Sequence, residues 1–341
     1  MLVNLLRREK RGLSFMETAL VTGGSGLIGK HIVSGLLKKG YAVISVDKED
    51  DGYNDGKPNY QFVKSEVTDR NKIAEIFQNN EIDLLVHAAC TVDNDLGPTV
   101  TEKEIKESAQ VDSFLYRYAM TEKVHKIVLL STDQVYDFPK SREPIREDDD
   151  LKITTNYASM KYAAEKALIT EVQYNELKKD PGDASSVCCI ARYSPIYTLD
   201  YTDNLMAKLK DPKDGELFIA GRGQYGFQMC CLHNLIDFIL CFATSADDQS
   251  YAGIYNVSDK LLTTAADIIG FMRENHHLGT VAQKNPMAVM AKLKGLFTGN
   301  KQDEKTNYRY LDVTKLENNN MLDNTRASKL VNFRWDIHNT T

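Results

Sequence analysis

Short apolar runs alternate with amphipathic stretches through the first half of the chain, which predicts repeated strand-helix units and a parallel sheet. Six runs have the length and composition of buried strands: Thr18–Thr22, Ala42–Val46, Gln61–Lys64, Leu84–His87, Lys126–Leu130 and Val187–Ala191. The stretches between them have helical spacing: Lys30–Lys38, Arg70–Gln78, Ile105–Ala119 and Tyr157–Leu177. After about residue 192, Tyr, Asn, Gly and Asp become frequent, and two further helices are predicted at Leu232–Ala243 and Ala265–Asn275.

Composition and charge exclude several classes of partner. The net charge of −6 argues against a nucleic-acid-binding surface, and no apolar run reaches the length of about 18 residues that a membrane span needs. Residues 1–15 carry basic charges after a short apolar run, the wrong order for a secretory signal. We therefore expect a cytoplasmic protein with an N-terminal extension at residues 1–16, no membrane contact and no nucleic acid.

The six cysteines indicate free thiols, because they form two adjacent pairs and two single sites without any CxxC. Cys230-Cys231 with His233 is the grouping closest to a metal site. No second Cys/His pair with ligand spacing accompanies it. We expect no metal.

A glycine-rich turn follows the first predicted strand. Gly23, Gly26 and Gly29 are spaced GxxGxxG, with Leu27 and Ile28 before the last glycine, and a helical pattern begins directly afterwards. Such glycines permit a sharp turn, close approach of the backbone to a pyrophosphate, and close packing of helix on strand. The alternative is an ordinary tight connection, but the strand before the turn and the helix after it favour dinucleotide binding.

Asp47 directly follows the second predicted strand, eighteen residues after Gly29. A carboxylate at this place accepts hydrogen bonds from an adenosine ribose and repels a 2′-phosphate, so it favours NAD over NADP. The alternative is a solvated acid, because Lys48 and three further acids follow.

Tyr157 and Lys161 stand four residues apart, on one face of a predicted helix. A phenol with the ordinary pKa of about 10 is a poor base at neutral pH, and a nearby ammonium favours the phenolate. A solvated helix face would give the same spacing by chance. Thr132 weighs against that alternative, because its hydroxyl follows a predicted strand where it can hydrogen-bond the substrate oxygen that Tyr157 protonates or deprotonates. We predict Thr132, Tyr157 and Lys161 as the catalytic residues.

In combination, the motifs resemble the extended short-chain dehydrogenase/reductases, a family of nucleotide-sugar epimerases, dehydratases and 4-keto-sugar reductases. The resemblance spans roughly Glu17 to Trp335 and rests on these elements: Thr22–Gly29, Glu66–Asp69, His87-Ala88-Ala89, Ser131-Thr132 with Val135-Tyr136, Tyr157 with Lys161, and Arg192 with Tyr197. It implies an α/β fold, a doubly wound parallel sheet of the Rossmann type, with NAD as cofactor. The cofactor contacts that it implies are Glu66 and Val67 at the adenine, His87, Ala88 and Ala89 along the dinucleotide, and Lys161 at the nicotinamide ribose.

The resemblance also implies how the chain is divided. Residues 17–192 are expected to form mainly the dinucleotide-binding domain. Residues 193–341 are expected to form mainly a smaller substrate lobe, with some segments returning to the Rossmann core. The implied assembly is a homodimer with a four-helix contact between Ile105–Ala119 and Tyr157–Leu177.

The substrate side departs from the family pattern. An asparagine that holds the substrate diphosphate in many epimerases is Pro195 here, and a late arginine is Gln228. We place the substrate contacts at Asp133, Gln134, Arg192 and Asn204. In related dehydratases, acidic groups follow the catalytic threonine, whereas this chain has Gln134, whose amide is no base for a C5 proton. We expect no 4,6-dehydratase activity.

The resulting hypothesis is NAD(P)-dependent redox chemistry at a carbon of a nucleotide-sugar. Tyr157 exchanges a proton with a sugar hydroxyl while hydride moves between that carbon and nicotinamide C4. The C-terminal pattern favours an epimerase, while Ser131-Thr132-Asp133 and Pro195 favour a 4-keto-sugar reductase. A catalytically silent, cofactor-binding regulatory subunit is the alternative from another class, and the intact Tyr157 weighs against it.

Overall fold

The computed structural model describes residues 16–90, 101–137, 143–153, 155–180, 184–211, 215–246, 249–285 and 321–340. At its centre lies a parallel sheet of seven strands in the order β11-β6-β5-β4-β1-β2-β3. These strands are β1 (Thr18–Thr22), β2 (Ala42–Asp47), β3 (Tyr60–Lys64), β4 (Leu84–His87), β5 (Lys126–Thr132), β6 (Val187–Tyr193) and β11 (Gly253–Val257). The predicted doubly wound parallel sheet is confirmed, and each of its six predicted strands lies within two residues of its predicted bounds.

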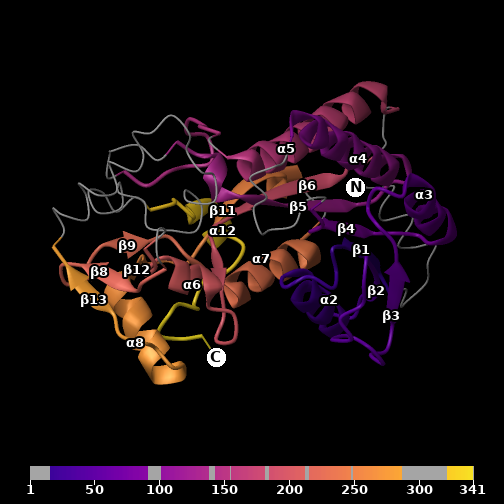
Figure 1. The fold of residues 1–341 in the computed structure, drawn as a ribbon. Helices are drawn as coiled ribbons and strands as arrows, with labels where there is room; N and C mark the ends of the chain where they lie inside the picture. The colour runs from indigo at the N-terminus through magenta and orange to yellow at the C-terminus, as the bar shows by residue number, and fades with distance from the viewer. Residues whose placement is uncertain are drawn as a thin grey trace.

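Helices cover both faces of the sheet (Figure 1). One face carries α3 (Arg70–Asn79), α4 (Glu102–Thr121) and α5 (Asn156–Lys178), and the other carries α2 (Gly29–Lys38) and α7 (Leu232–Thr244). Successive strand residues point to opposite faces, so Leu20 packs in the first layer while Ala19 and Val21 pack in the second. The sheet therefore lies between two layers of helices and contributes side chains to both.

Side-chain caps fix where several helices begin. Asp69 accepts a hydrogen bond from the backbone of α3, and Thr155 does the same for α5. Thr101 opens α4 in a reciprocal capping box with Glu104. In contrast, Ile28 at the start of α2 supplies no side-chain cap.

A second cluster of short elements lies beyond residue 193. It contains three two-stranded pairs: β7 (Ile196–Tyr197) with β10 (Cys230–Cys231), β8 (Phe218–Ala220) with β13 (Ala282–Lys284), and β9 (Gly226–Phe227) with β12 (Thr263–Thr264). The described residues beyond 193 also contain the helices α6 (Asp203–Ala207), α8 (Ala265–Asn275) and α12 (Thr325–Ser328). Tyr197, Phe227 and Ile268 pack in a core of their own, whereas α7 and β11 return to the layers of the large sheet.

A buried carboxylate joins these two parts of the chain. Asp259, two residues past β11, is 1% exposed and accepts hydrogen bonds from Tyr197 Oη at 2.7 Å, from Cys231 N at 2.8 Å and from Asn234 Nδ2 at 2.7 Å. Burial raises the pKa of this carboxyl to about 7, although its three donors oppose the rise. Asp259 thus changes charge near neutral pH.

Three further observations concern the N-terminal extension, membrane spans and the thiols. The expected N-terminal extension lies outside the described residues except for Met16. Within the described ranges, no helix is long and apolar enough to cross a membrane. All six cysteines are free, and burial raises the pKa of the Cys231 thiol to about 12, so this side chain packs as a small apolar group.

Candidate functional site

The candidate site lies at the carboxyl edge of the sheet, where parallel strands end side by side. Pairing of β1 with β4 sets Thr22 opposite His87, and pairing of β5 with β6 sets Thr132 opposite Tyr193. Asp47 ends β2 at the same edge. Ligands of open α/β sheets bind along this edge.

The glycine turn has no room for side chains at positions 23 and 29. Gly23 has φ +71°, and a Cβ added there would lie 2.7 Å from Ala89 N. A Cβ added to Gly29 would lie 1.9 Å from Gly23 O. Gly26 closes the turn by donating its N–H to Gly23 O at 3.2 Å. Only glycine at positions 23 and 29 lets the turn pack against both β4 and its own helix.

These features fit a dinucleotide. The turn leads directly into α2, whose N-terminus has no side-chain cap and faces the position where a pyrophosphate binds in such turns. Asp47 stands beside the turn, because its carboxylate accepts the N–H of Ser25 at 2.9 Å and of Lys48 at 2.8 Å. Leu27 and Ile28 are both half-buried, and Ile28 packs on the α2–α7 core.

Two predicted adenine contacts follow β3. The Glu66 side chain is exposed and accepts a hydrogen bond from Thr68 Oγ1 at 3.0 Å. Val67 is half-buried and packs against the core under α3 and α4. Glu66 is therefore open to solvent at the strand end, while Val67 helps anchor the loop.

His87 lies behind the cofactor edge, with both ring nitrogens engaged by the protein. Nδ1 lies 2.7 Å from Thr22 Oγ1 and Nε2 lies 3.0 Å from Asp112 Oδ1, and the His87 side chain is buried. The imidazole therefore has no free nitrogen for a ligand, whereas the half-buried Ala88 and Ala89 lie beside the turn. The sequence did not reveal Asp112, which lies on α4.

The start of α5 brings the predicted catalytic pair to the end of β5. Thr155 Oγ1 accepts the N–H of Ala158 at 3.0 Å, which places Tyr157 in the first helical turn. One turn later the buried Lys161 donates from Nζ to Leu130 O at 3.1 Å. The ammonium is thus held two residues before Thr132 along the same strand.

Tyr157 has a second phenol beside it that the sequence did not indicate. Tyr193 ends β6 and shares a side-chain hydrogen bond with Tyr157, and burial raises the pKa of the Tyr193 phenol. Tyr193 therefore stays neutral beside the predicted catalytic tyrosine.

Thr132 is buried and oriented by the residue that the sequence predicts as a substrate contact. Its Oγ1 accepts hydrogen bonds from Gln134 N at 3.3 Å and from Gln134 Nε2 at 3.4 Å. Since these donors occupy lone pairs of the oxygen, the Thr132 hydroxyl proton points elsewhere. Asp133, between the two, is also buried.

Arg192 forms a buried ion pair. Its Nε and Nη2 donate to the two oxygens of Glu165 at 3.0 Å and 2.7 Å, and Ser131 also donates to Glu165. Nη1 donates to Glu147 O at 3.3 Å. Arg192 and Glu165 are 3% and 1% exposed, so this guanidinium braces the end of β5 through Ser131.

Other residues of the predicted substrate side are also engaged by the protein. Asn204 donates to Ile196 O at 2.8 Å. Gln228 donates to Asp259 O and accepts from Leu322 N, both at 3.0 Å. The carbonyl of Pro195 accepts the N–H of Cys230 at 3.0 Å. Gln228 and Pro195 thus fasten the short strands of the lobe to their neighbours.

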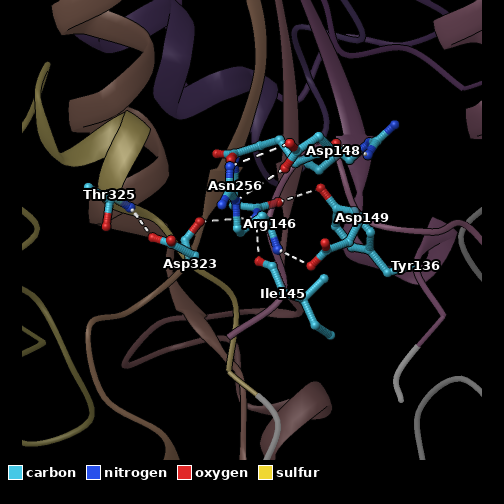
Figure 2. A network of polar contacts seen from close by, with 10 residues as sticks. Tyr136, Ile145, Arg146, Asp148, Asp149, Asn256, Asp323 and Thr325 are labelled. Atoms are coloured by element: carbon cyan, nitrogen blue, oxygen red, sulfur yellow. Dashed lines mark hydrogen bonds and ion pairs between the residues drawn. The ribbon is translucent and has the colours of Figure 1, made fainter. Parts of the chain in front are cut away.

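A polar network fixes the segment that follows β5 (Figure 2). Asn256 on β11 accepts a hydrogen bond from Tyr136 Oη at 2.6 Å and donates to Ile145 O at 3.0 Å and to Asp323 O at 3.1 Å. Beside it Arg146 donates its N–H to Asp149 at 2.8 Å. A single asparagine therefore joins Tyr136 after β5, the following loop and the C-terminal segment.

Comparison with known proteins decides the family. The model of the NAD dependent epimerase/dehydratase family matches residues 19–258. The chain belongs to this family. The predicted resemblance, the prediction of an enzyme and the expectation of NAD as cofactor are confirmed at this level.

Curated relatives of this epimerase/dehydratase chain carry two activities. A mouse dTDP-D-glucose 4,6-dehydratase is 29% identical over 295 residues, which cover 74% of the chain and 82% of the relative. A Drosophila melanogaster UDP-glucose 4-epimerase is 29% identical over 176 residues, covering 44% of the chain and 47% of the relative. Several other matches, including the bovine 4,6-dehydratase at 45%, likewise span about half of the relative's length.

Solved structures share the fold across nearly the whole chain. The UDP-glucuronic acid 4-epimerase of Bacillus cereus, in complex with UDP-glucuronic acid and NAD, has a TM-score of 0.69 at 17% identity and covers 95% of this chain and 96% of its own. The UDP-glucose 4-epimerase of Thermotoga maritima with UDP-glucose has a TM-score of 0.64 at 19% identity, covering 92% and 91%. At these identities the likeness concerns the fold.

Proposed function

We propose that this family member is a nucleotide-sugar epimerase, which oxidises a sugar hydroxyl and reduces the resulting ketone from the other face. The observation that carries the proposal is that Thr132 ends β5, Lys161 is held against that strand and Tyr157 opens α5, at the same carboxyl edge of the sheet that carries the glycine turn. A sugar carbon at this edge lies next to both a proton-transfer group and the nicotinamide position.

The proposed roles follow from the hydrogen bonds of each group. Tyr157 takes the hydroxyl proton and later returns it, and the Lys161 ammonium favours its phenolate. Thr132 donates a hydrogen bond to the sugar oxygen, because Gln134 occupies lone pairs of Oγ1 and turns the hydroxyl proton outward. The turn at Gly23–Gly29 would hold NAD, which when bound would supply the hydride acceptor and donor.

The other predicted contacts receive roles that fit their surroundings. We assign Arg192 to positioning, since its donors hold Glu165 and through it Ser131, the neighbour of Thr132. Asp133 and Asn204 remain proposed substrate contacts at the crevice. The Asp47 carboxylate, beside the turn, would hold the adenosine ribose.

Gln134 argues against a 4,6-dehydratase and so favours the proposed epimerase. A 4,6-dehydratase must remove a proton from C5 and expel water from C6, which needs an acid and a base beyond the tyrosine. The Gln134 side chain is an amide that donates to Thr132, so the base is missing from that place. A 4-keto-sugar reductase is the second candidate, favoured by Pro195, which stands where many epimerases have an asparagine.

The deciding experiment uses purified protein with a trace of NAD and three probes: UDP-glucose, UDP-glucuronic acid and dTDP-glucose. We expect at least one probe to yield its C4 epimer, seen by NMR, without net formation of NADH. Net consumption of NADH with a 4-keto-sugar would instead establish the reductase. If the protein binds NAD yet converts none of these sugars, the epimerase proposal is wrong for this substrate class.

A further inference from the structure

A buried chain of hydrogen bonds runs from helix α4 to the glycine turn. Asp112 Oδ1 lies 3.0 Å from His87 Nε2, and His87 Nδ1 lies 2.7 Å from Thr22 Oγ1. Thr22 Oγ1 in turn lies 3.5 Å from Ala89 N. Thr22, His87 and Asp112 are 0%, 2% and 4% exposed, so water does not compete for these contacts.

The order of donors along this chain follows from its ends. A carboxylate accepts only, so His87 Nε2–H donates to Asp112. The other ring nitrogen, Nδ1, shares a hydrogen bond with Thr22 Oγ1, and the Thr22 oxygen accepts the N–H of Ala89. In proteins a carboxylate commonly fixes the tautomer and orientation of an imidazole, and the imidazole then holds the next group that it contacts.

The chain of hydrogen bonds ends at the contact between the glycine turn and the end of β4. The backbone of Ala89 lies so close to Gly23 that a Cβ on Gly23 would meet it at 2.7 Å. Ala88 also donates its N–H to Thr22 O at 3.1 Å. On the opposite side, Gly23 N is held by Val46 O at 2.8 Å. The turn is thus clamped between β2 and β4, and His87 sets the β4 side.

We propose that Asp112 is a positioning residue for the dinucleotide, acting through His87 and Thr22 on the backbone that borders the glycine turn. The inference rests on NAD binding at this turn and is independent of which sugar is converted. Asp112 does not touch the cofactor. Its effect is to keep Ala88 and Ala89 where the dinucleotide needs them, because a shift of about 1 Å in a supporting group is enough to weaken a preorganised site.

The test is NAD titration by calorimetry, which needs no sugar and no turnover, so it stands apart from the epimerase proposal. We expect Asp112→Asn to weaken NAD binding about ten-fold, since an amide can present either its oxygen or its nitrogen to His87 and no longer fixes the ring. Thr22→Val, which removes only the hydroxyl, should weaken binding by a similar factor, and Thr22→Ser should restore it to within about two-fold. The double variant Asp112→Asn/Thr22→Val should be no weaker than the more affected single variant, because both cut the same chain.

Tyr41→Phe is the matched control. Tyr41 is buried, directly precedes β2 at the opposite edge of the sheet, and donates to Ala243 O at 3.0 Å. Its loss should lower Tm and leave the Kd for NAD unchanged. If Asp112→Asn and Thr22→Val behave like this control, with lower Tm and an unchanged Kd, the chain is merely structural and the inference fails. Should Asp112→Asn not fold, the Thr22→Val and Thr22→Ser pair decides alone.

Discussion

Asp259→Asn should remove a pH dependence of stability that this one buried carboxyl creates. The pKa of Asp259 rises from an ordinary 3.8 to about 7 in the folded protein, because burial disfavours the charged form. A raised carboxyl pKa means that the folded state holds its proton more tightly than the unfolded chain. Its contribution to stability is therefore complete below about pH 4 and is lost as the pH rises to about 7.

The magnitude follows from the size of the shift. Each pH unit between the two pKa values changes the free energy of unfolding by about 1.4 kcal/mol, so between pH 5 and pH 8 the wild type should lose about 3 kcal/mol relative to the variant. Asparagine preserves the packing, because its oxygen accepts from Cys231 N and Asn234 Nδ2 while its amide donates to Tyr197 Oη in place of accepting from it.

The assay is urea unfolding of wild type and Asp259→Asn at half-unit steps from pH 5 to pH 8. Asp203→Asn, at an exposed position in the first turn of α6, controls for the loss of one negative charge. The free energy of unfolding of Asp259→Asn minus that of the wild type should rise with pH and level off near pH 8. A difference that stays constant across the range would show that Asp259 keeps the same charge throughout, and the reasoning from burial would be refuted.

Four further predictions concern the site and the assembly. Tyr157→Phe should lower turnover at least about a thousand-fold while NAD affinity stays within about two-fold, measured by activity assay beside cofactor titration; turnover near the wild-type rate would remove Tyr157 from the mechanism. NAD should bind at least about ten-fold more tightly than NADP, because the Asp47 carboxylate beside the turn repels a 2′-phosphate; tighter NADP binding in calorimetry would contradict this. With dTDP-glucose and NAD, no product lighter by one water should form, and catalytic formation of the 4-keto-6-deoxy sugar would overturn the reading of Gln134. Sedimentation at micromolar concentration should show a homodimer through α4 and α5, where the Ile169 and Tyr174 side chains of α5 are exposed; a monomer alone would count against it.

The regular part of the fold is predictable because its elements are long enough to show a period. Strands β1 to β6 and helices α2 to α5, α7 and α8 follow from apolar spacing, within about three residues at each end. The pairs β7 with β10 and β9 with β12 have two residues per strand, too few for any alternation to register. β11 also escaped prediction, since Gly253–Val257 lies in a polar, irregular stretch and becomes a sheet strand only by pairing with β6.

The residues of the candidate site also differ in how well the sequence predicts them. Residues inside compact motifs, such as the glycines of the turn and Tyr157 with Lys161, carry their spacing in the sequence. Partners contributed by other elements do not: Asp112 lies 25 residues from His87, and Glu165 lies 27 residues from Arg192. Those distances give no local pattern, so the sequence predicts Arg192 as a substrate contact, whereas in the fold it is half of a buried ion pair.

Asn256 has a consequence for how the protein is made. Its amide binds the carbonyl of Ile145, 111 residues earlier, and that of Asp323, 67 residues later. Synthesis runs from the N-terminus, so the glycine turn and the three proposed catalytic residues leave the ribosome well before Asp323 does. Contacts of such long range close slowly. A nascent chain can therefore form its glycine turn early, yet the loop that follows β5 acquires its last anchor only after Asp323 has been synthesised.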